Sequence, residues 1–415
     1  MFIKTNKVSC LIICTSMFTD EEIHYFKVKF GDLFSVVFLI PYGEEIPAAL
    51  TQGSLIVKEE LIDRITYERV LKKIVTLANV PSNECVFISK NIEFIKHVLY
   101  QPVGTIWISD GSLSYDVIGH LPDKKINHIE ELEDALEVKH GYFAEVCTTI
   151  LSSNQSYNNS GVIFSFEMNR ENTKFNVISA GRYFGPKHEC FNSHQLSQRI
   201  RKSKYDDSQN ELFASIYIPI INDLNNTTKV DGVTRVPSRP EKVDRLKPIV
   251  RYIVKDTLFE DFSDKIICPD NYPQHKDLSR DRRFENVKNK FFVDGDFTNK
   301  HIVIIDDVFT TGATAYECAK QFYSAGASKV TVVVLGVNQF SNEFMVQRYA
   351  KCPKCGGNML LKINHRENIA FYGCENYTKT PKCRFTEGFL SGWYRIIEEN
   401  SINAVQEEHQ EDWLF

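Results

Sequence analysis

The stretch His301-Ile-Val-Ile-Ile-Asp-Asp-Val-Phe-Thr-Thr-Gly-Ala-Thr314 decides the fold of the central part of this chain. Its apolar opening, Ile302–Ile305, is a run of β-branched residues, which is typical of a buried central strand. Two carboxylates, Asp306 and Asp307, follow where that strand is expected to end. A short turn then leads into Ala313–Lys320, whose helix formers and apolar spacing predict a helix. The pattern therefore predicts a strand, two acids, a turn and a helix of an open α/β sheet.

The turn between this strand and helix suits a bound anion. In open α/β sheets, ligands bind beyond the carboxyl ends of the strands, and a helix N-terminus there favours a phosphate. Gly312 lets the backbone approach the anion closely, and hydroxyl donors come from Thr310, Thr311 and Thr314. Because the aspartates would repel a phosphate, we expect them to hold hydroxyls or a cation. The residues thus predict a sugar-phosphate site, and the alternative is a solvated strand–turn–helix without a ligand.

The segment from Val303 to Thr314 resembles the signature of type I phosphoribosyltransferases that binds phosphoribosyl pyrophosphate (PRPP). The resemblance implies a phosphoribosyltransferase parallel sheet over residues 160–345. It implies that Asp306 and Asp307 are the catalytic acids, holding ribose hydroxyls directly or through Mg²⁺. The substrate-binding residues that it implies in this turn are Val308, Thr310, Thr311, Gly312, Ala313 and Thr314.

A second segment carries related chemistry. The short strand Gly232–Val236 breaks at Pro237-Ser238-Arg239, an order that resembles the ComF-like branch of the same family. The resemblance implies that Ser238 and Arg239 contact the pyrophosphate; the alternative is an ordinary turn with a solvated arginine.

The basic stretch Asp277–Phe292 also looks ComF-like and predicts a mobile catalytic loop with its return strand. Its candidate cations, for which structural salt bridges are an equal alternative, are Arg280, Arg282 and Arg283. A hood that grips the acceptor base is expected within Gly181–Lys204.

Residues 1–145 alternate apolar strands with helices, which predicts a three-layer α/β unit with a parallel sheet. We expect strands at Ser9–Thr15, Ser35–Ile40, Cys85–Ile88 and Thr105–Ile108, and helices at Lys58–Leu77, Ile92–Leu99 and Ile129–Leu136. The order from Asn79 to Leu136 resembles a haloacid-dehalogenase-like (HAD-like) Rossmannoid domain. An active member needs carboxylates where this chain has Cys14–Met17 and Ser89–Asn91. The resemblance therefore implies a degenerate, catalytically dead unit; an unusual active enzyme is the alternative.

The third element is Cys352-Pro-Lys-Cys355 with Cys374 and Cys383, a spacing that predicts a structural Zn²⁺ site of four thiolates. Residues 346–395 resemble the four-cysteine zinc ribbon at the C-terminus of bacterial type IA topoisomerases. That resemblance implies binding of single-stranded DNA or RNA on aromatic and basic side chains, here Phe371, Tyr372, Tyr377, Lys379, Lys382 and Arg384. The alternative is a ribbon used for stability or protein docking.

Bulk properties set the remaining limits. The chain has 415 residues, which predicts two or three domains, and its net charge of −5 excludes an overall basic footprint. Seven of its eleven cysteines are scattered in apolar runs, which favours buried thiols in a reducing, cytoplasmic protein. No stretch is long enough to span a bilayer. We expect a linker at Ser152–Asn159 and an acidic tail at residues 396–415, either as a disordered terminus or as a docking segment for a protein partner.

Together these features predict a Mg²⁺-dependent phosphoribosyltransferase-type protein, with a base or a nucleic acid as acceptor. DNA uptake, repair and phage defence are the processes that such a combination favours. The alternative is a non-catalytic module that senses PRPP or a nucleotide and binds single-stranded nucleic acid through the ribbon.

Overall fold

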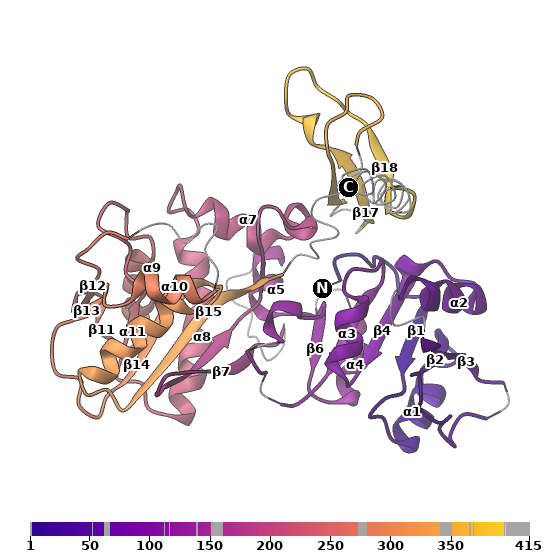
Figure 1. Ribbon diagram of the computed structural model, residues 1–415, viewed down its shortest axis with the longest axis horizontal. Helices are drawn as coiled ribbons and strands as arrows, with labels where there is room; N and C mark the ends of the chain where they lie inside the picture. Colours follow the sequence, from indigo (N-terminus) through magenta and orange to yellow (C-terminus); the bar gives the residue numbers. More distant parts are fainter. Residues whose placement is uncertain are drawn as a thin grey trace, which may run out of the picture.

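The protein consists of two α/β sheets and a small C-terminal ribbon (Figure 1). The computed structural model describes residues 2–51, 53–61, 67–111, 113–115, 117–137, 140–150, 161–272, 280–340, 351–364, 367, 369–393 and 395. The expected linker Ser152–Asn159 and the expected acidic tail lie outside the described residues. The mixed α/β class with a parallel sheet and a C-terminal ribbon is confirmed.

The first sheet is parallel throughout and has the strand order β3-β2-β1-β4-β5-β6. Its central strand β1 is wholly buried, as its continuous apolar sequence requires in a sheet covered on both faces. The strands are β1 (Cys10–Cys14), β2 (Ser35–Ile40), β3 (Leu55–Lys58), β4 (Cys85–Ser89), β5 (Gly104–Ile108) and β6 (Lys124–Ile126). The helices are α1 (Asp20–Phe30), α2 (Glu68–Ala78), α3 (Ile92–Val98) and α4 (Leu132–Leu136).

One predicted helix of this sheet is present but begins later than predicted. The prediction placed a helix over Lys58–Leu77, but Leu55–Lys58 forms the edge strand β3, and α2 begins at Glu68. Helix α1 was not predicted, although its capping box is a local signal. There the Thr19 side chain accepts from the Glu22 amide, and the Glu22 carboxylate accepts from the Thr19 amide.

The second sheet has the order β11-β10-β14-β15-β8-β7, and β9 pairs with the end of β15. All of these pairings are parallel except the β7–β8 hairpin. The strands are β7 (Phe164–Arg170), β8 (Thr173–Ser179), β9 (Arg182–Phe184), β10 (Gly232–Arg235), β11 (Glu260–Asp261), β14 (His301–Phe309) and β15 (Lys329–Gln339). The helices around it are α5 (Phe143–Ile150), α7 (Gln195–Lys202), α8 (Asn210–Thr227), α9 (Leu246–Lys255), α10 (Arg280–Val287) and α11 (Ala313–Ser324).

Part of the expected catalytic loop is a helix. Residues Arg280–Val287 form α10, and its Phe284 ring packs edge-on against Tyr316 of α11 at 5.6 Å between centroids. The preceding residues of the loop, Asp277–Ser279, lie outside the described ranges. The expected return strand is present in short form, as β13 (Phe292–Val293) paired with β12 (Ile266–Ile267).

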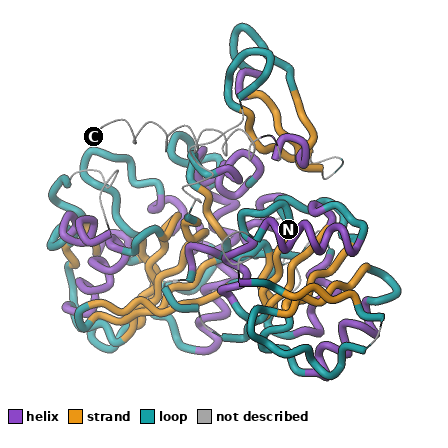
Figure 2. Tube along the Cα trace, turned by 45° about the vertical axis from the view of Figure 1, so that its right-hand side comes forward, coloured by secondary structure: helices purple, strands orange, loops and turns teal. Residues whose placement is uncertain are grey.

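The ribbon is an antiparallel sheet of β16 (Met359–Asn364), β17 (Ile369–Cys374) and β18 (Thr386–Gly388). Its core includes Met359 and Trp393, and it continues into Ile3, Phe184 and Cys190 from the rest of the chain. Figure 2 shows the ribbon above the two sheets. Because these side chains share one core with the ribbon, the ribbon packs on the protein body.

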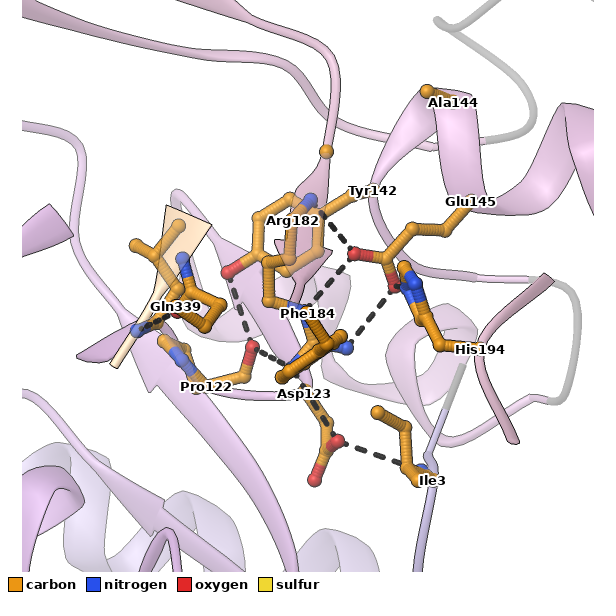
Figure 3. Close-up of polar contacts among 12 residues, drawn as sticks. Ile3, Pro122, Asp123, Tyr142, Ala144, Glu145, Arg182, Phe184, His194 and Gln339 are labelled. Carbon is orange, nitrogen blue, oxygen red and sulfur yellow. Dashed lines mark hydrogen bonds and ion pairs between the residues drawn. The ribbon is translucent and has the colours of Figure 1, made fainter. Parts of the chain in front are cut away.

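A buried ion network joins the two sheets (Figure 3). Arg182 of β9 is 2% exposed, and its Nε and Nη2 donate to the two carboxylate oxygens of Glu145 at 2.9 and 3.0 Å. Its Nη1 donates to the Pro122 carbonyl at 2.8 Å, in the loop before β6. His194, just before α7, lies 3.3 Å from Glu145 Oε2. The network therefore fixes α5, α7 and the second sheet against the first.

The seven scattered cysteines are all buried and free, so the prediction of buried thiols is confirmed: Cys10, Cys14, Cys85, Cys147, Cys190, Cys268 and Cys318. None of the helices in the described ranges has the length and apolar character needed to cross a bilayer.

Candidate functional site

The two predicted chemical segments of the second sheet meet at one edge. Strands β10 and β14 are parallel neighbours in register, with Arg235 opposite Ile305. Their carboxyl ends therefore point the same way, toward the edge where ligands bind in open α/β sheets. Strand β14 runs on to Phe309, so Asp306 and Asp307 lie within its last residues instead of after its end.

The turn after β14 has the geometry of an anion cradle. Gly312 is the N-cap of α11 in the left-handed region, at φ 79°, and the first amides of the helix have no intrahelical acceptor. A Cβ on Gly312 would lie 2.4 Å from the Phe309 ring. Thr310 is exposed, and Thr311 and Thr314 are half-buried. Within the described part of the chain, the hydroxyls of these three threonines make no hydrogen bond.

The turn also rests on a residue that the sequence interpretation missed. Tyr115, from the segment that follows the first sheet's β5, donates its hydroxyl to the Thr311 carbonyl at 3.2 Å. Its ring packs edge-on against Phe309 at 6.1 Å. The first sheet thus contributes a support to the turn, and no short-range sequence signal marks it.

The two acids differ in their partners. Burial raises the pKa of Asp306 well above its ordinary value, and the charge of Asp307 raises it further. Asp307 Oδ2 lies 3.1 Å from Nη2 of Arg245, just before α9, which sequence reasoning did not single out. The Tyr217 hydroxyl of α8 donates to the Asp306 carbonyl at 2.7 Å. A pair of adjacent carboxylates in this setting favours a cation beside it, and Arg245 supplies one.

The predicted Ser238 and Arg239 lie on the wall of a cavity of about 740 Å³. The Arg239 guanidinium donates to the Tyr272 carbonyl at 2.8 Å and lies over the Tyr272 ring. Ser238 donates to the Val243 carbonyl at 3.2 Å. Arg245 lines the same cavity and pairs with Asp307, so this arginine links the cavity wall to the acids of β14, which do not line the cavity themselves.

The predicted arginines of residues 276–290 are separated from this cavity. None of the residues that line it comes from α10. Asp281 of α10 pairs with Arg170 of β7, and Phe284 faces α11. The structure therefore does not bring Arg282 or Arg283 to the cavity wall.

The four predicted zinc ligands lie together. The sulfur atoms of Cys352, Cys355, Cys374 and Cys383 are all within 4.8 Å of one another. Two of the distances between them are 3.6 and 3.4 Å, near the roughly 3.8 Å that tetrahedral Zn–S bonds of about 2.3 Å require. The Gly357 amide and the Asn376 side chain lower the pKa of Cys355 to about 6. The donor set fits Zn²⁺ held by four thiolates in a structural site.

The predicted stacking surface of the ribbon is only partly exposed. Tyr372 is 3% exposed and stacks on Phe389 inside the ribbon core, so its predicted role is wrong. Tyr377 is 51% exposed, and Lys362 lies over its ring at 5.8 Å. The other exposed candidates are Lys379, Lys382 and Arg384, and Phe371 is half-buried.

Comparison with known proteins identifies the ribbon. Residues 349–391 match the family described as topoisomerase DNA binding C4 zinc finger. A DNA topoisomerase 1 from Mycoplasma genitalium is 23% identical over 164 residues, which are 34% of this chain and 22% of that protein. The chain thus spans about a fifth of the length of this curated relative.

One solved structure overlaps much of the chain. The structure of Leishmania donovani UMP synthase covers 81% of this chain and 87% of its own, with 12% identity and a TM-score of 0.24. A score that low does not define a common fold. The C-terminal part of this chain is a topoisomerase-type C4 zinc ribbon, and its four cysteines form the cluster that such a ribbon needs.

Proposed function

We propose that the edge of the second sheet binds PRPP and that the protein transfers its ribosyl phosphate to a nitrogen of a base or of a nucleic acid. One observation carries this proposal: the turn between β14 and α11 combines a left-handed Gly312 with three threonine hydroxyls that have no partner in the described ranges. A helix N-terminus with such donors is suited to a phosphate.

Each end of PRPP has a matching group in this proposal. The 5′-phosphate lies on the α11 amides and on the hydroxyls of Thr310, Thr311 and Thr314, against Val308 and Ala313. Asp306 and Asp307 hold the ribose hydroxyls, directly or through Mg²⁺-bound water, and Ser238 and Arg239 hold the pyrophosphate. Carboxylates together with substrate phosphates are a usual Mg²⁺ donor set, and the raised pKa of Asp306 marks a place where a cation is favourable. Bound Mg²⁺ would neutralise charge on the pyrophosphate.

The reaction is a displacement at C1′ of the ribose. The C1′–O bond breaks and its electron pair leaves with pyrophosphate, a bond from the acceptor nitrogen to C1′ forms, and the acceptor's proton passes to water. The Arg239 guanidinium, on the wall of the cavity, stabilises the charge that develops on the leaving group.

The alternative is a protein that binds PRPP or a nucleotide without turnover and reads single-stranded nucleic acid through the ribbon. The ion pair between Arg245 and Asp307 favours it, because a proposed ribose ligand is already engaged.

We also propose a division of the chain. Residues 1–145 would form a degenerate HAD-like unit, 160–345 the phosphoribosyltransferase unit, 346–395 the ribbon and 396–415 an acidic tail that docks a protein partner. The parallel order β3-β2-β1-β4-β5-β6 supports a Rossmannoid unit. Cys14 ends β1 and Ser89 ends the neighbouring β4, so no carboxylate stands at either strand end. A cytoplasmic location fits the free thiols.

Isotope exchange between labelled pyrophosphate and PRPP, with a panel of bases, tests the reaction. Wild type should exchange only with Mg²⁺ and an acceptor base. Thr311→Val should weaken PRPP binding by about tenfold or more, the usual cost of a lost hydrogen bond to a charged group. Thr76→Val, an exposed position on α2, is the matched control. Absent exchange with intact calorimetric binding of PRPP would leave only the sensing alternative, and absent binding would remove both.

A further inference from the structure

The cavity beside the acids of β14 has a lining that PRPP alone does not explain. Cavities of roughly 300–1,000 Å³ hold drug-sized ligands and are mostly apolar, whereas this one presents four cations and one acid, Glu241. Its volume is about 740 Å³. The cations are Lys204, Arg239, Lys242 and Arg245.

Two of these cations are paired within the described ranges, and the other two are not. Arg245 pairs with Asp307, and Arg239 is held by Tyr272. The ammonium groups of Lys204 and Lys242 have no acidic or hydrogen-bonding partner within the ranges that the structure describes. Lys204 lies in the connection between α7 and α8, and Lys242 lies in the segment between β10 and α9. Two separate segments of the chain thus bring these lysines to the cavity. This arrangement suits a ligand with more than one negative charge.

An exposed aromatic ring lines the same cavity as these lysines. Tyr205 lines the cavity and is 79% exposed, so the fold does not use its ring for packing. An exposed ring among cations is the element with which proteins stack the bases of single strands without regard to sequence. Tyr272, on another wall, is buried and supports Arg239.

Helix α7 connects this cavity with the ribbon. At its start, Ser193, His194 and Gln195 enclose a small cavity together with Ile363 of β16. Its eight residues rise about 12 Å, and the chain then reaches Lys204 and Tyr205. In Figure 1, α7 lies between the ribbon and α9. Arg201 and Lys202 are exposed at the C-terminal end of α7, next to Lys204, and Lys202 lies 3.8 Å from Asp206.

We propose that these groups form a track for one strand of nucleic acid, which runs from the ribbon along α7 into the cavity. Lys204, Lys242 and Arg201 neutralise backbone phosphates, and Tyr205 stacks on a base. The strand then presents its next base beside Asp306 and Asp307. That last placement rests on the proposed function and makes a polymer the acceptor, whereas the track itself stands without it.

Fluorescence anisotropy with the full-length, zinc-loaded protein tests the track. The probes are labelled oligothymidylates of 4, 8 and 16 nucleotides, which cover the usual single-strand site sizes of roughly 4 to 16 nucleotides. Tyr205→Ala should weaken binding of the 16-mer by about five- to 150-fold, the measured range for one lost stack. The 4-mer, which fits on the ribbon alone, should bind as it does to wild type.

The double variant Lys204→Glu with Lys242→Glu should also reduce the salt dependence of 16-mer binding. The slope of log K against log salt should become shallower by about 1.4, since each lost phosphate contact on a single strand removes about 0.7. The matched control is Lys255→Glu, an exposed lysine at the far end of α9. The double variant and the Lys255→Glu control should both keep the wild-type melting temperature.

Two results would overturn the track. One is that Tyr205→Ala and the double lysine variant bind the 16-mer as tightly as the Lys255→Glu control does. The other is that these variants lose affinity equally for the 4-mer and the 16-mer. PRPP titration on wild type separates this outcome from the proposed function. Failure of PRPP binding with intact length dependence removes the phosphoribosyl activity and leaves the track.

Discussion

Loss of zinc is expected to unfold the ribbon. Cys374→Ser combined with Cys383→Ser should abolish the binding of one zinc ion per chain and leave residues 351–393 open to proteolysis. A segment of this size buries too little apolar surface to fold without a metal or other support, and structural Zn²⁺ contributes an apparent free energy of roughly 10–16 kcal/mol in zinc-finger peptides. Here part of the ribbon core comes from Ile3 and Phe184, but these contacts do not replace the four thiolates.

Metal content by mass spectrometry, followed by limited proteolysis, measures this effect. The control is Cys268→Ser, because the Cys268 thiol lies outside the cluster and donates to the Asp270 carbonyl, a bond that serine retains. Full zinc occupancy in the double variant would show that these cysteines are not the ligands. Binding of the 4-nucleotide probe should be lost together with the zinc, which also tests the ribbon as a binding element.

The second large effect is expected at the buried ion network. Glu145→Ala should lower the free energy of unfolding by roughly 3–5 kcal/mol, because it removes the two short carboxylate contacts of the buried Arg182 guanidinium and leaves only Asp123, at 3.5 Å. The control is Glu130→Ala, at an exposed position before α4, where a change within about 0.5 kcal/mol is expected. The free energy of unfolding is measured by urea denaturation, monitored for each sheet separately. A loss of this free energy no larger than that of Glu130→Ala would contradict the stabilising role of Glu145.

The same network predicts a dependence on pH. Burial alone would raise the pKa of Glu145, but Arg182 and His194 outweigh burial and hold this pKa well below its usual value. A carboxyl whose pKa is lowered by folding stabilises the protein at pH values above the pKa that the same carboxyl has in the unfolded chain. For glutamate that pKa is about 4.3. The stabilisation should therefore be complete at neutral pH and decline as the pH falls below about 4.3, and Glu145→Ala should lack this component.

Short-range patterns predicted the central elements well. The strand, turn and helix from His301 onward depend on β-branched residues, a positive-φ glycine and helix formers, all within one segment. The cysteine cluster was equally accessible, because ligand spacing is encoded locally. The burial of Tyr372 was also within reach, since side chains alternate along a strand and Tyr372 shares a face with Cys374, whose thiol points into the cluster.

Long-range contacts were beyond such patterns. Arg182 and Glu145 are 37 residues apart, and Arg245 and Asp307 are 62 apart, so only the packed fold brings them together. The same holds for Tyr115, which reaches Thr311 from the first sheet. The early start predicted for the helix at Lys58–Leu77 has a related cause, because edge strand β3 is defined by its pairing with β2 rather than by its own sequence.

Calorimetric titration of PRPP with Mg²⁺ into wild type and Gly312→Val tests whether the turn between β14 and α11 binds PRPP. Valine is strained at φ 79°, and its Cβ would meet the Phe309 ring, so the turn must shift. Gly185→Ala, at a glycine with open space around it, is the control. We expect one PRPP site per chain in wild type and Gly185→Ala, and at least tenfold weaker binding in Gly312→Val. Wild type without a PRPP site, or Gly312→Val with unchanged affinity, would contradict PRPP binding at this turn.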